Sequence, residues 1–382
     1  MAFGRDEQSA RGAKLSRVRA WLRESAATAV VFTTAGPVAW LTGGLTNRIE
    51  RGHPASPLWV VVREADETAI TTEVEAPRLA SEGDLQMPLV SVPWYDGAAF
   101  AAAASRVANA PASELASDGD AAFAIDASDE LALLRLPLLP DEQRRMRELG
   151  RDAAAALEES LRAFRPGERD IEIQARVADA LERRGALAVC LIVGGDERIE
   201  RFRHPLSSGA PVERVVMAVV VAERGGLHAA ATRYASAGPL PVRVERARRV
   251  ALEIEGAILA ACAVGTTYGE VLRVCDAAYA DAGHPGAWRE HYQGGPIAYR
   301  QREFEVAPAA SAETPFTQAA IGVGHALAWN PSVAGGGKAE DPYLVGDGGL
   351  TRVTDSGDWP LLADGRPAAL NVLEGSAAED TR

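Results

Sequence analysis

The sequence of 382 residues contains few cysteines and few lysines, and its cysteine usage excludes two kinds of site. Among the 40 lysine and arginine residues, only Lys14 and Lys338 are lysines. The three cysteines are odd in number and have no C-x-x-C spacing: Cys190, Cys262 and Cys275. This usage argues against a disulfide framework or a thiolate metal site, and it is typical of a reducing compartment.

Long hydrophobic runs and the core of a signal peptide are also missing. The longest apolar runs, such as 215–222, have the length of a strand and are too short to cross a bilayer. Residues 1–16 are polar and of mixed charge, without the apolar segment of a signal peptide. Positive charge is in deficit, and the net charge of -13 repels phosphate backbones. We therefore expect a cytoplasmic protein that binds neither membranes nor nucleic acid.

The first third of the chain alternates between helical and strand-like patterns. Its apolar periodicity predicts a helix at 15–26, strands at 29–32, 38–44, 58–62 and 69–72, and a helix at 98–109. Such alternation is typical of a three-layer α/β domain. This domain is expected to span residues 14–138.

The remainder of the chain contains a weak internal repeat. Long helices are predicted at 141–164 and 170–185, and again at 244–262 and 268–282. Each pair is joined by a glycine-bearing turn and followed by strand-like sequence. We expect both helix pairs to pack against one strongly curved antiparallel sheet, with a pocket on its open side. This second domain is expected to span residues 141–366.

Several segments resemble the pita-bread domain of creatinase, aminopeptidase P and methionine aminopeptidase, in that family's order. They are RPGERDIEIQARVADAL, GGLHAAATRY, VGTTYGEVLRVCDAAYADAGH and GKAEDPYLV. The stretch WLTGGLTNRIERG resembles the N-terminal domain of creatinase. The resemblance covers residues 14–365 and implies an α+β pita-bread C-terminal domain, a smaller three-layer α/β N-terminal domain and a homodimer.

The resemblance also implies where a metal site would lie. Metallopeptidases of this family hold two cations with two aspartates, a histidine and two glutamates, and the cations activate a water. The residues at those positions here are Val219, Ala230, Gly295, Asn330 and Glu340. Only Glu340 keeps a ligand type, and one carboxylate cannot hold a dinuclear centre. We therefore predict no metal ligands and no cofactor.

Two residues are candidates for catalysis without a metal. The segment from Phe202 to Leu206 resembles the turn whose histidine handles the protons in creatinase, which cleaves a C–N bond. His204 would take that role, since an imidazole with a pKa of about 6.5 exchanges protons near neutral pH. The resemblance assigns Glu340 to a carboxylate that holds the substrate. The alternatives are a histidine in a surface loop and a glutamate paired with Lys338.

A polar cluster around the segment HYQGGPIAY is the candidate substrate-binding site. Its imidazole, amide, phenol and guanidinium groups suit a carboxylate or an amide: His291, Gln293, Tyr299 and Arg302. Asn330 is expected to hydrogen-bond the substrate in place of a metal ligand. His228 is either a packed histidine or a binding residue. Arg48 would reach the partner subunit's pocket, as the likeness to creatinase dimers implies.

These patterns predict a metal-independent hydrolase of a C–N bond, amide or amidine-like, in a small carboxylate-bearing molecule, similar to creatinase or ectoine hydrolase. An alternative is a catalytically inactive pita-bread protein that binds a ligand or a partner. A third is a metallopeptidase of the Xaa-Pro aminopeptidase type. Beyond a second copy of the chain and a small-molecule substrate, no partner is predicted.

Overall fold

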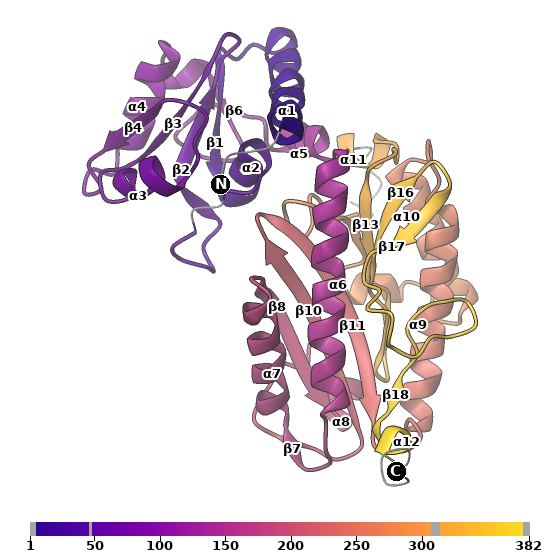
Figure 1. Cartoon of the computed structure of the whole chain (residues 1–382). Coiled ribbons are helices and arrows are strands. Elements are labelled where there is room, and N and C mark those ends of the chain that lie inside the picture. The colour runs from indigo at the N-terminus through magenta and orange to yellow at the C-terminus, as the bar shows by residue number, and fades with distance from the viewer. Residues whose placement is uncertain (1–4, 46–47, 307–313, 377–382) are drawn as a thin grey trace. The chain divides into compact units, whose positions relative to one another are not determined.

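The computed structural model describes residues 5–45, 48–306 and 314–376 (Figure 1). The chain divides into two compact units. The N-terminal unit comprises Met1–Asp141 with Gly225–Leu227, and the C-terminal unit comprises Glu142–Arg224 with His228–Arg382. Within the described ranges, no helix is both long enough and apolar enough to cross a membrane.

The N-terminal unit is built on a six-stranded mixed sheet with the order β4-β3-β2-β1-β5-β6. Its strands are β1 (Ala29–Thr34), β2 (Ala55–Val62), β3 (Glu67–Thr72), β4 (Leu89–Val92), β5 (Leu115–Ser117) and β6 (Ile125–Asp126). Its helices are α1 (Arg5–Glu24), α2 (Ala35–Thr42), α3 (Ala76–Glu82), α4 (Ala99–Ala108), α5 (Ser128–Arg135) and the 3₁₀ helix η1 (Ala112–Glu114). Val31, Val61 and Ile70 of the three central strands share one buried core, as β-branched residues on a covered sheet face do.

One predicted element of this unit is wrong. Residues 38–44 were expected to form a strand, but α2 occupies Ala35–Thr42 and ends at Gly43, whose φ of 78° suits glycine. All eight residues of α2 are buried. A helix buried on every side shows no amphipathic period, so an apolar run of this length does not distinguish it from a strand. The other elements predicted here are observed.

The C-terminal unit contains the four long helices that the sequence predicts. They are α6 (Pro140–Arg162), α7 (Asp170–Arg183), α9 (Val242–Ala261) and α10 (Tyr268–Asp281). The shorter helices are α8 (Glu197–Arg201), η2 (Ala287–Glu290), α11 (Pro315–Gln318) and α12 (Val372–Ser376). A capping box of Thr267 and Glu270 starts α10, because each side chain satisfies a backbone N–H that the first helical turn leaves unpaired.

The strands of this unit form two four-stranded sheets rather than the single sheet expected. One has the order β18-β11-β10-β8 and the other β12-β13-β16-β17. These strands are β8 (Leu187–Gly195), β10 (Val215–Arg224), β11 (Leu227–Ser236), β12 (Gly294–Pro296), β13 (Ala326–Trp329), β16 (Pro342–Gly346), β17 (Gly349–Arg352) and β18 (Leu370–Asn371). Backbone hydrogen bonds from His228 to Ala298 and from Thr232 to Glu340 still connect the two groups. The expected sheet is therefore interrupted, and its first half includes a parallel pair, β11 with β18.

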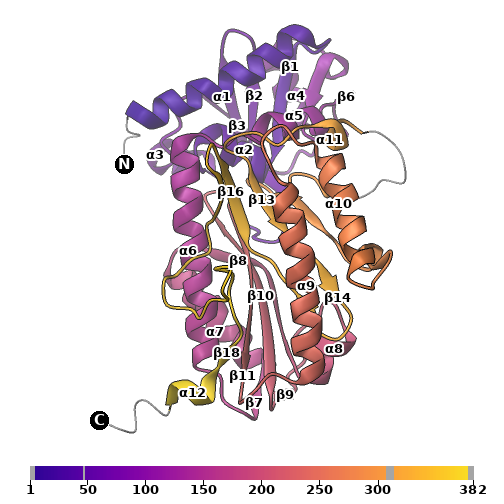
Figure 2. The same cartoon turned by 90° about the vertical axis from the view of Figure 1, so that its right-hand side faces the viewer.

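Two small strand pairs complete the unit: β7 (Glu168–Arg169) with β9 (Pro211–Val212), and β14 (Ser332–Val333) with β15 (Gly337–Lys338). The second pair makes the glycine-rich segment before Lys338 a hairpin turn. Helix α9 packs against this hairpin (Figure 2). A Cβ atom on Gly337 would lie 2.3 Å from the carbonyl oxygen of Ala247, so only glycine permits this approach. The hairpin thereby fixes the backbone position of Lys338.

Candidate active site

A cavity of about 230 Å³, here called the polar cavity, lies within the C-terminal unit. Its walls come from β8, β10, the turn after α8, the segments on either side of β12, and the hairpin segment. The side chains that line it are Cys190, Ile192, His204, Val219, Val221, His291, Tyr292, Gln301, Arg302, Glu305, Asn330, Lys338 and Glu340. Five of the nine residues predicted to form the site meet here: His204, His291, Arg302, Asn330 and Glu340.

Two histidines and a lysine share one hydrogen-bonding atom in this cavity. Nε2 of His291 lies 3.0 Å from Nε2 of His204 and 3.0 Å from Nζ of Lys338. Nδ1 of His291 lies 2.7 Å from the carbonyl oxygen of Tyr292. A carbonyl only accepts, so Nδ1 of His291 carries the proton and its Nε2 is the acceptor.

Nε2 of His291 has one lone pair, which the Lys338 amine and an N–H on Nε2 of His204 share if both donate to it. A neutral His204 that donates in this way carries its proton on Nε2, which leaves Nδ1 with a free lone pair. His204 is the more exposed of the two histidines.

Burial and the charge of Lys338 keep the imidazoles of His204 and His291 neutral. Burial, together with the charge of Lys338, lowers the pKa of His291 to about 2. The same two causes lower the pKa of His204 below its ordinary value. Burial also lowers the pKa of the Lys338 amine to about 8, although Glu340 opposes the shift. At neutral pH both imidazoles are therefore uncharged, while most of the Lys338 amine is protonated.

A second group in the cavity is an ion pair. NH2 of Arg302 donates to Oε1 of Glu340 at 2.5 Å, and Nε of Arg302 lies 3.9 Å from Oε2 of Glu305. Glu340 is only 3% exposed, so its charge depends on this guanidinium for compensation. Oε1 of Glu305 accepts a hydrogen bond from the backbone N–H of Gly294 at 2.6 Å, and burial raises the pKa of this carboxyl.

Asn330 contributes an unused hydrogen-bonding atom. Its side chain is 7% exposed, and its Oδ1 is buried without a hydrogen-bond partner among the described residues. A buried amide oxygen left unpaired costs free energy, which a donor from a ligand or a water would offset. Asn330 is therefore prepared to accept a hydrogen bond from a molecule in the polar cavity.

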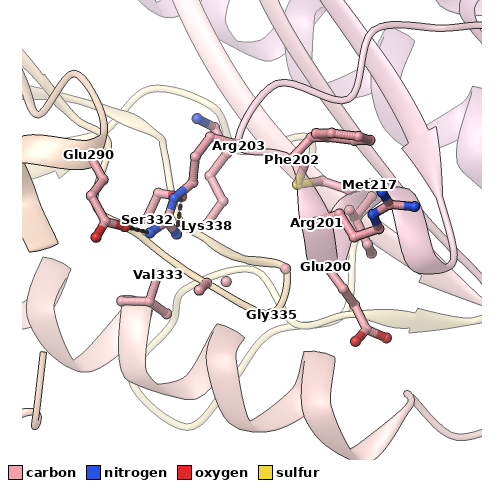
Figure 3. Close-up of a pocket in the computed structure, with 14 residues that line it drawn as sticks. Glu200, Arg201, Phe202, Arg203, Met217, Glu290, Ser332, Val333, Gly335 and Lys338 are labelled. Carbon is pink, nitrogen blue, oxygen red and sulfur yellow. Dashed lines mark hydrogen bonds and ion pairs between the residues drawn. The ribbon is translucent and has the colours of Figure 1, made fainter.

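Two further cavities adjoin the polar cavity. The glycine-loop cavity, of about 160 Å³, is bounded by Phe202, Met217 and the turn before Lys338. Arg203 lines this cavity (Figure 3). Its NH2 donates to Oε2 of Glu290 at 2.6 Å, and its NH1 donates to Oγ of Ser332 at 3.3 Å. The aromatic cavity, of about 400 Å³, is lined by Trp288, Arg289, Glu290, His291, Tyr292, Gln293, Glu305 and Val306.

Comparison with known proteins identifies the family. The model of metallopeptidase family M24 matches residues 144–349, more than half of the chain. The chain belongs to metallopeptidase family M24. No curated protein matches the sequence.

Solved structures share the fold of this M24 protein across nearly its whole length. Dipeptidase PepE from Mycobacterium ulcerans has a TM-score of 0.74 at 18% identity, with 97% of this chain and 99% of that chain covered. The prolidase from Pyrococcus horikoshii OT3 has a TM-score of 0.72 at 16% identity, covering 90% and 98%. The N-terminal domain of FACT complex subunit SPT16 from chickpea has a TM-score of 0.67 at 10% identity, covering 91% and 97%. The predicted pita-bread fold with its N-terminal α/β domain is confirmed.

The side chains of this M24 protein do not fit a pair of divalent cations. Of the positions that the family resemblance assigns to ligands, Val219, Asn330 and Glu340 line the polar cavity, and only Glu340 is an acid. Its carboxylate is already paired with Arg302. Within residues 5–45, 48–306 and 314–376, no three His, Cys, Asp or Glu side chains are grouped to hold a metal ion. We therefore derive no step through a metal.

Three residues predicted to bind substrate lie outside the polar cavity and have other partners. Gln293 uses its side-chain amide to bind the backbone of Trp288 and His291 and the hydroxyl of Tyr279. Tyr299 donates to Glu142 and accepts from Arg145 of α6. His228 is 3% exposed and contacts the carbonyl of Ala298. None of the three lines the polar cavity, although Gln293 lines the neighbouring aromatic cavity.

The fourth, Arg48, belongs to the N-terminal unit. Its role at a partner subunit's pocket stays a prediction.

Lys338, Glu305 and Cys190 line the polar cavity but were not predicted as site residues. The sequence could have drawn attention to Lys338, because it is one of two lysines in a chain whose other basic residues of this class are arginines. Both lysines are buried, Lys14 against the carbonyl of Trp40 and Lys338 against His291. For Glu305 and Cys190 the sequence gives no signal, since neither lies in a recognisable motif.

Proposed function

We propose that this protein hydrolyses a C–N bond, an amide or a similar group, in a small carboxylate-bearing molecule without a metal ion. The observation that carries the proposal is the contact of His204, His291 and Lys338 beside the Arg302–Glu340 ion pair. These groups supply a neutral base, a cation and a fixed guanidinium in one cavity. Such a set suits hydrolysis of a polar bond.

His204 is the general base in this proposal. Its Nδ1 takes a proton from a water, whose oxygen attacks the carbon of the C–N bond. The same nitrogen then returns the proton to the leaving nitrogen as the C–N bond breaks. The lowered pKa of His204 keeps this nitrogen unprotonated at neutral pH. His291 holds the ring through Nε2 and acts as a positioning residue.

The Arg302–Glu340 pair stabilises the negative charge that develops on the oxygen of the attacked group. Glu340 fixes the guanidinium of Arg302 through a 2.5 Å hydrogen bond, and a fixed donor needs no reorganisation during the reaction. This differs from the predicted role of Arg302 as the carboxylate-binding cation. In this proposal Lys338 binds the substrate carboxylate instead, and Arg302 faces the oxygen of the attacked group. Asn330 accepts a hydrogen bond from the substrate through its unpaired Oδ1.

The experiment is a turnover screen of small N-acyl amino acids with and without a chelator. We expect activity that the chelator leaves unchanged and that His204→Ala lowers by at least about a hundredfold. His284→Ala is the control, because His284 lines none of the three cavities. Activity that disappears with chelator and returns with Mn²⁺ would refute the proposal and favour a metallopeptidase of the Xaa-Pro type, the activity named for several structural neighbours.

The second candidate is a protein that binds a ligand or a partner without catalysis. The loss of acids at the family's ligand positions favours it, and the fold also occurs in a subunit of the FACT complex. A thermal-shift screen combined with product analysis distinguishes the two candidates. A compound that raises the melting temperature and is recovered intact supports binding alone.

The expected homodimer also remains a proposal. If Arg48 completes the partner subunit's polar cavity, Arg48→Ala mixed with His204→Ala should restore part of the activity that each variant lacks. Sedimentation of the purified protein tests the dimer itself.

A further inference from the structure

The polar cavity and the aromatic cavity are neighbours that share part of their lining. His291, Tyr292 and Glu305 line both. The polar cavity holds His204, Lys338 and the Arg302–Glu340 pair, with Ile192, Val219 and Val221 among its apolar residues. The aromatic cavity has Trp288, Tyr292 and Val306 beside the polar residues Arg289, Glu290, His291, Gln293 and Glu305. The aromatic cavity is also the larger, at about 400 Å³ against about 230 Å³. A molecule beside His291 can therefore reach Lys338 and Arg302 in the polar cavity and the rings of Trp288 and Tyr292 in the aromatic cavity.

The inner wall of the aromatic cavity is held in place before any ligand arrives. Trp288 is 8% exposed, and its indole N–H donates to Asp276 at 2.5 Å. The guanidinium of Arg289 stacks over the Trp288 ring at 4.1 Å from its centroid. Val306 is 3% exposed. A preformed apolar wall binds without the entropy cost of ordering its side chains.

The outer wall is Tyr292, whose ring has little protein contact. Its side chain is 68% exposed. Its ring centroid is 6.3 Å from that of His291, at an interplanar angle of 74°. The hydrogen bond from Nδ1 of His291 to the Tyr292 carbonyl fixes the backbone under this ring. Tyr292 thus offers an aromatic face next to the imidazole that supports His204, where a flat group can stack.

We propose that the substrate has two parts: a small carboxylate-bearing amine in the polar cavity and a flat apolar acyl group in the aromatic cavity. The scissile C–N bond would then lie beside His291, between the two parts. This inference rests on the proposed hydrolase function and names its substrate class, N-aroyl or similar N-acyl derivatives of small amino acids. Tyr292 acts as a specificity-determining residue.

The test measures binding separately from turnover. The probes are N-benzoylglycine and N-acetylglycine, which share the carboxylate and the amide and differ in the acyl group. Isothermal titration of the full chain should give N-benzoylglycine at least about a tenfold lower Kd. Tyr292→Ala should reduce this ratio towards one, whereas Tyr292→Phe, which keeps the ring, should preserve it. Val242→Ala, an exposed apolar residue that lines none of the three cavities, is the control for surface changes.

The outcomes separate this inference from the proposed function. Equal Kd values for the two probes, or a ratio that survives Tyr292→Ala, would overturn the two-part substrate even if one probe is hydrolysed. A ratio that depends on the Tyr292 ring, with both probes recovered intact, would uphold the cavity assignment and count against hydrolysis. Because Tyr292 is exposed, Tyr292→Ala should fold like the native protein, which its thermal unfolding checks.

Discussion

Glu340 and Asp341 are consecutive residues, yet each pairs with a different arginine for a different purpose. Asp341 accepts from Arg233, which also binds Glu158 and the backbone carbonyls of Thr232 and Thr354. This cluster is sealed, with side-chain exposures of 1% for Arg233, 4% for Glu158 and 7% for Asp341. Its hydrogen bonds end within the protein.

The Arg302–Glu340 pair is open by comparison. The guanidinium of Arg302 is 18% exposed and borders the polar cavity, as do Glu340 and the unpaired Oδ1 of Asn330. Residue type alone does not separate the two clusters, since each is an arginine with carboxylates. The clusters differ in burial and in hydrogen bonding. A buried network whose polar atoms are all hydrogen-bonded supports the fold, whereas a network that borders a cavity and has an unpaired polar atom can bind a ligand.

The largest expected effect comes from breaking the sealed cluster. Arg233→Met should lower the free energy of unfolding by about 3–5 kcal/mol, because it leaves Glu158 and Asp341 buried without a cation. The matched variant Arg302→Met should cost less than half as much, because it deprives only Glu340 of its partner and the charge of Lys338 still interacts with that carboxylate. Urea unfolding of both variants measures the two losses. Equal losses would mean that the two clusters do not differ as described.

The next effect concerns catalysis. Glu340→Gln should lower turnover about a hundredfold with little change in stability, since it frees the guanidinium that the reaction requires to be fixed. Asp341→Asn, one residue further, should mainly destabilise the protein. Turnover and urea unfolding, measured side by side on the two variants, provide the check. Loss of turnover in Asp341→Asn alone, at full stability, would reverse the assignment.

The smallest effect is a change with pH. Lys338 has a pKa of about 8, so its amine is charged below that pH and loses the charge above it. Binding of N-acetylglycine should therefore weaken as the pH rises from 7 to 9, by about tenfold. In Lys338→Met the binding should be weak throughout and show no step. A step that persists in this variant would assign the titration to another group.

The sequence predicted best where a periodic pattern is imposed by burial. The long helices α6, α7, α9 and α10 follow from apolar residues that recur every three or four positions. The site residues came instead from motif resemblance, which brought together His204 and His291 from distant parts of the chain.

Side-chain direction in the irregular segments on either side of β12 could not be predicted. Tyr299 was expected in the pocket, yet its hydroxyl donates to Glu142 of α6. Gln293 was expected to bind substrate, and its side-chain amide instead binds the backbone of Trp288 and His291 and the hydroxyl of Tyr279, although the residue lines the aromatic cavity. Neither outcome follows from periodicity, because outside regular helices and strands no fixed repeat decides which way a side chain points.

The backbone of β12 leaves no room for a side chain at Gly295. Gly295 occupies the position that the family resemblance gives to the histidine ligand, and its φ is 150°. A Cβ atom there would lie 2.7 Å from Cγ2 of Val306 and 3.1 Å from the carbonyl oxygen of Phe304. Glu340 already carries a ligand type, so four ligand side chains would have to be introduced, and the one at Gly295 would require the backbone of this strand to shift. A protein engineer who wished to install the family's metal site here would therefore have to redesign the main chain before the side chains.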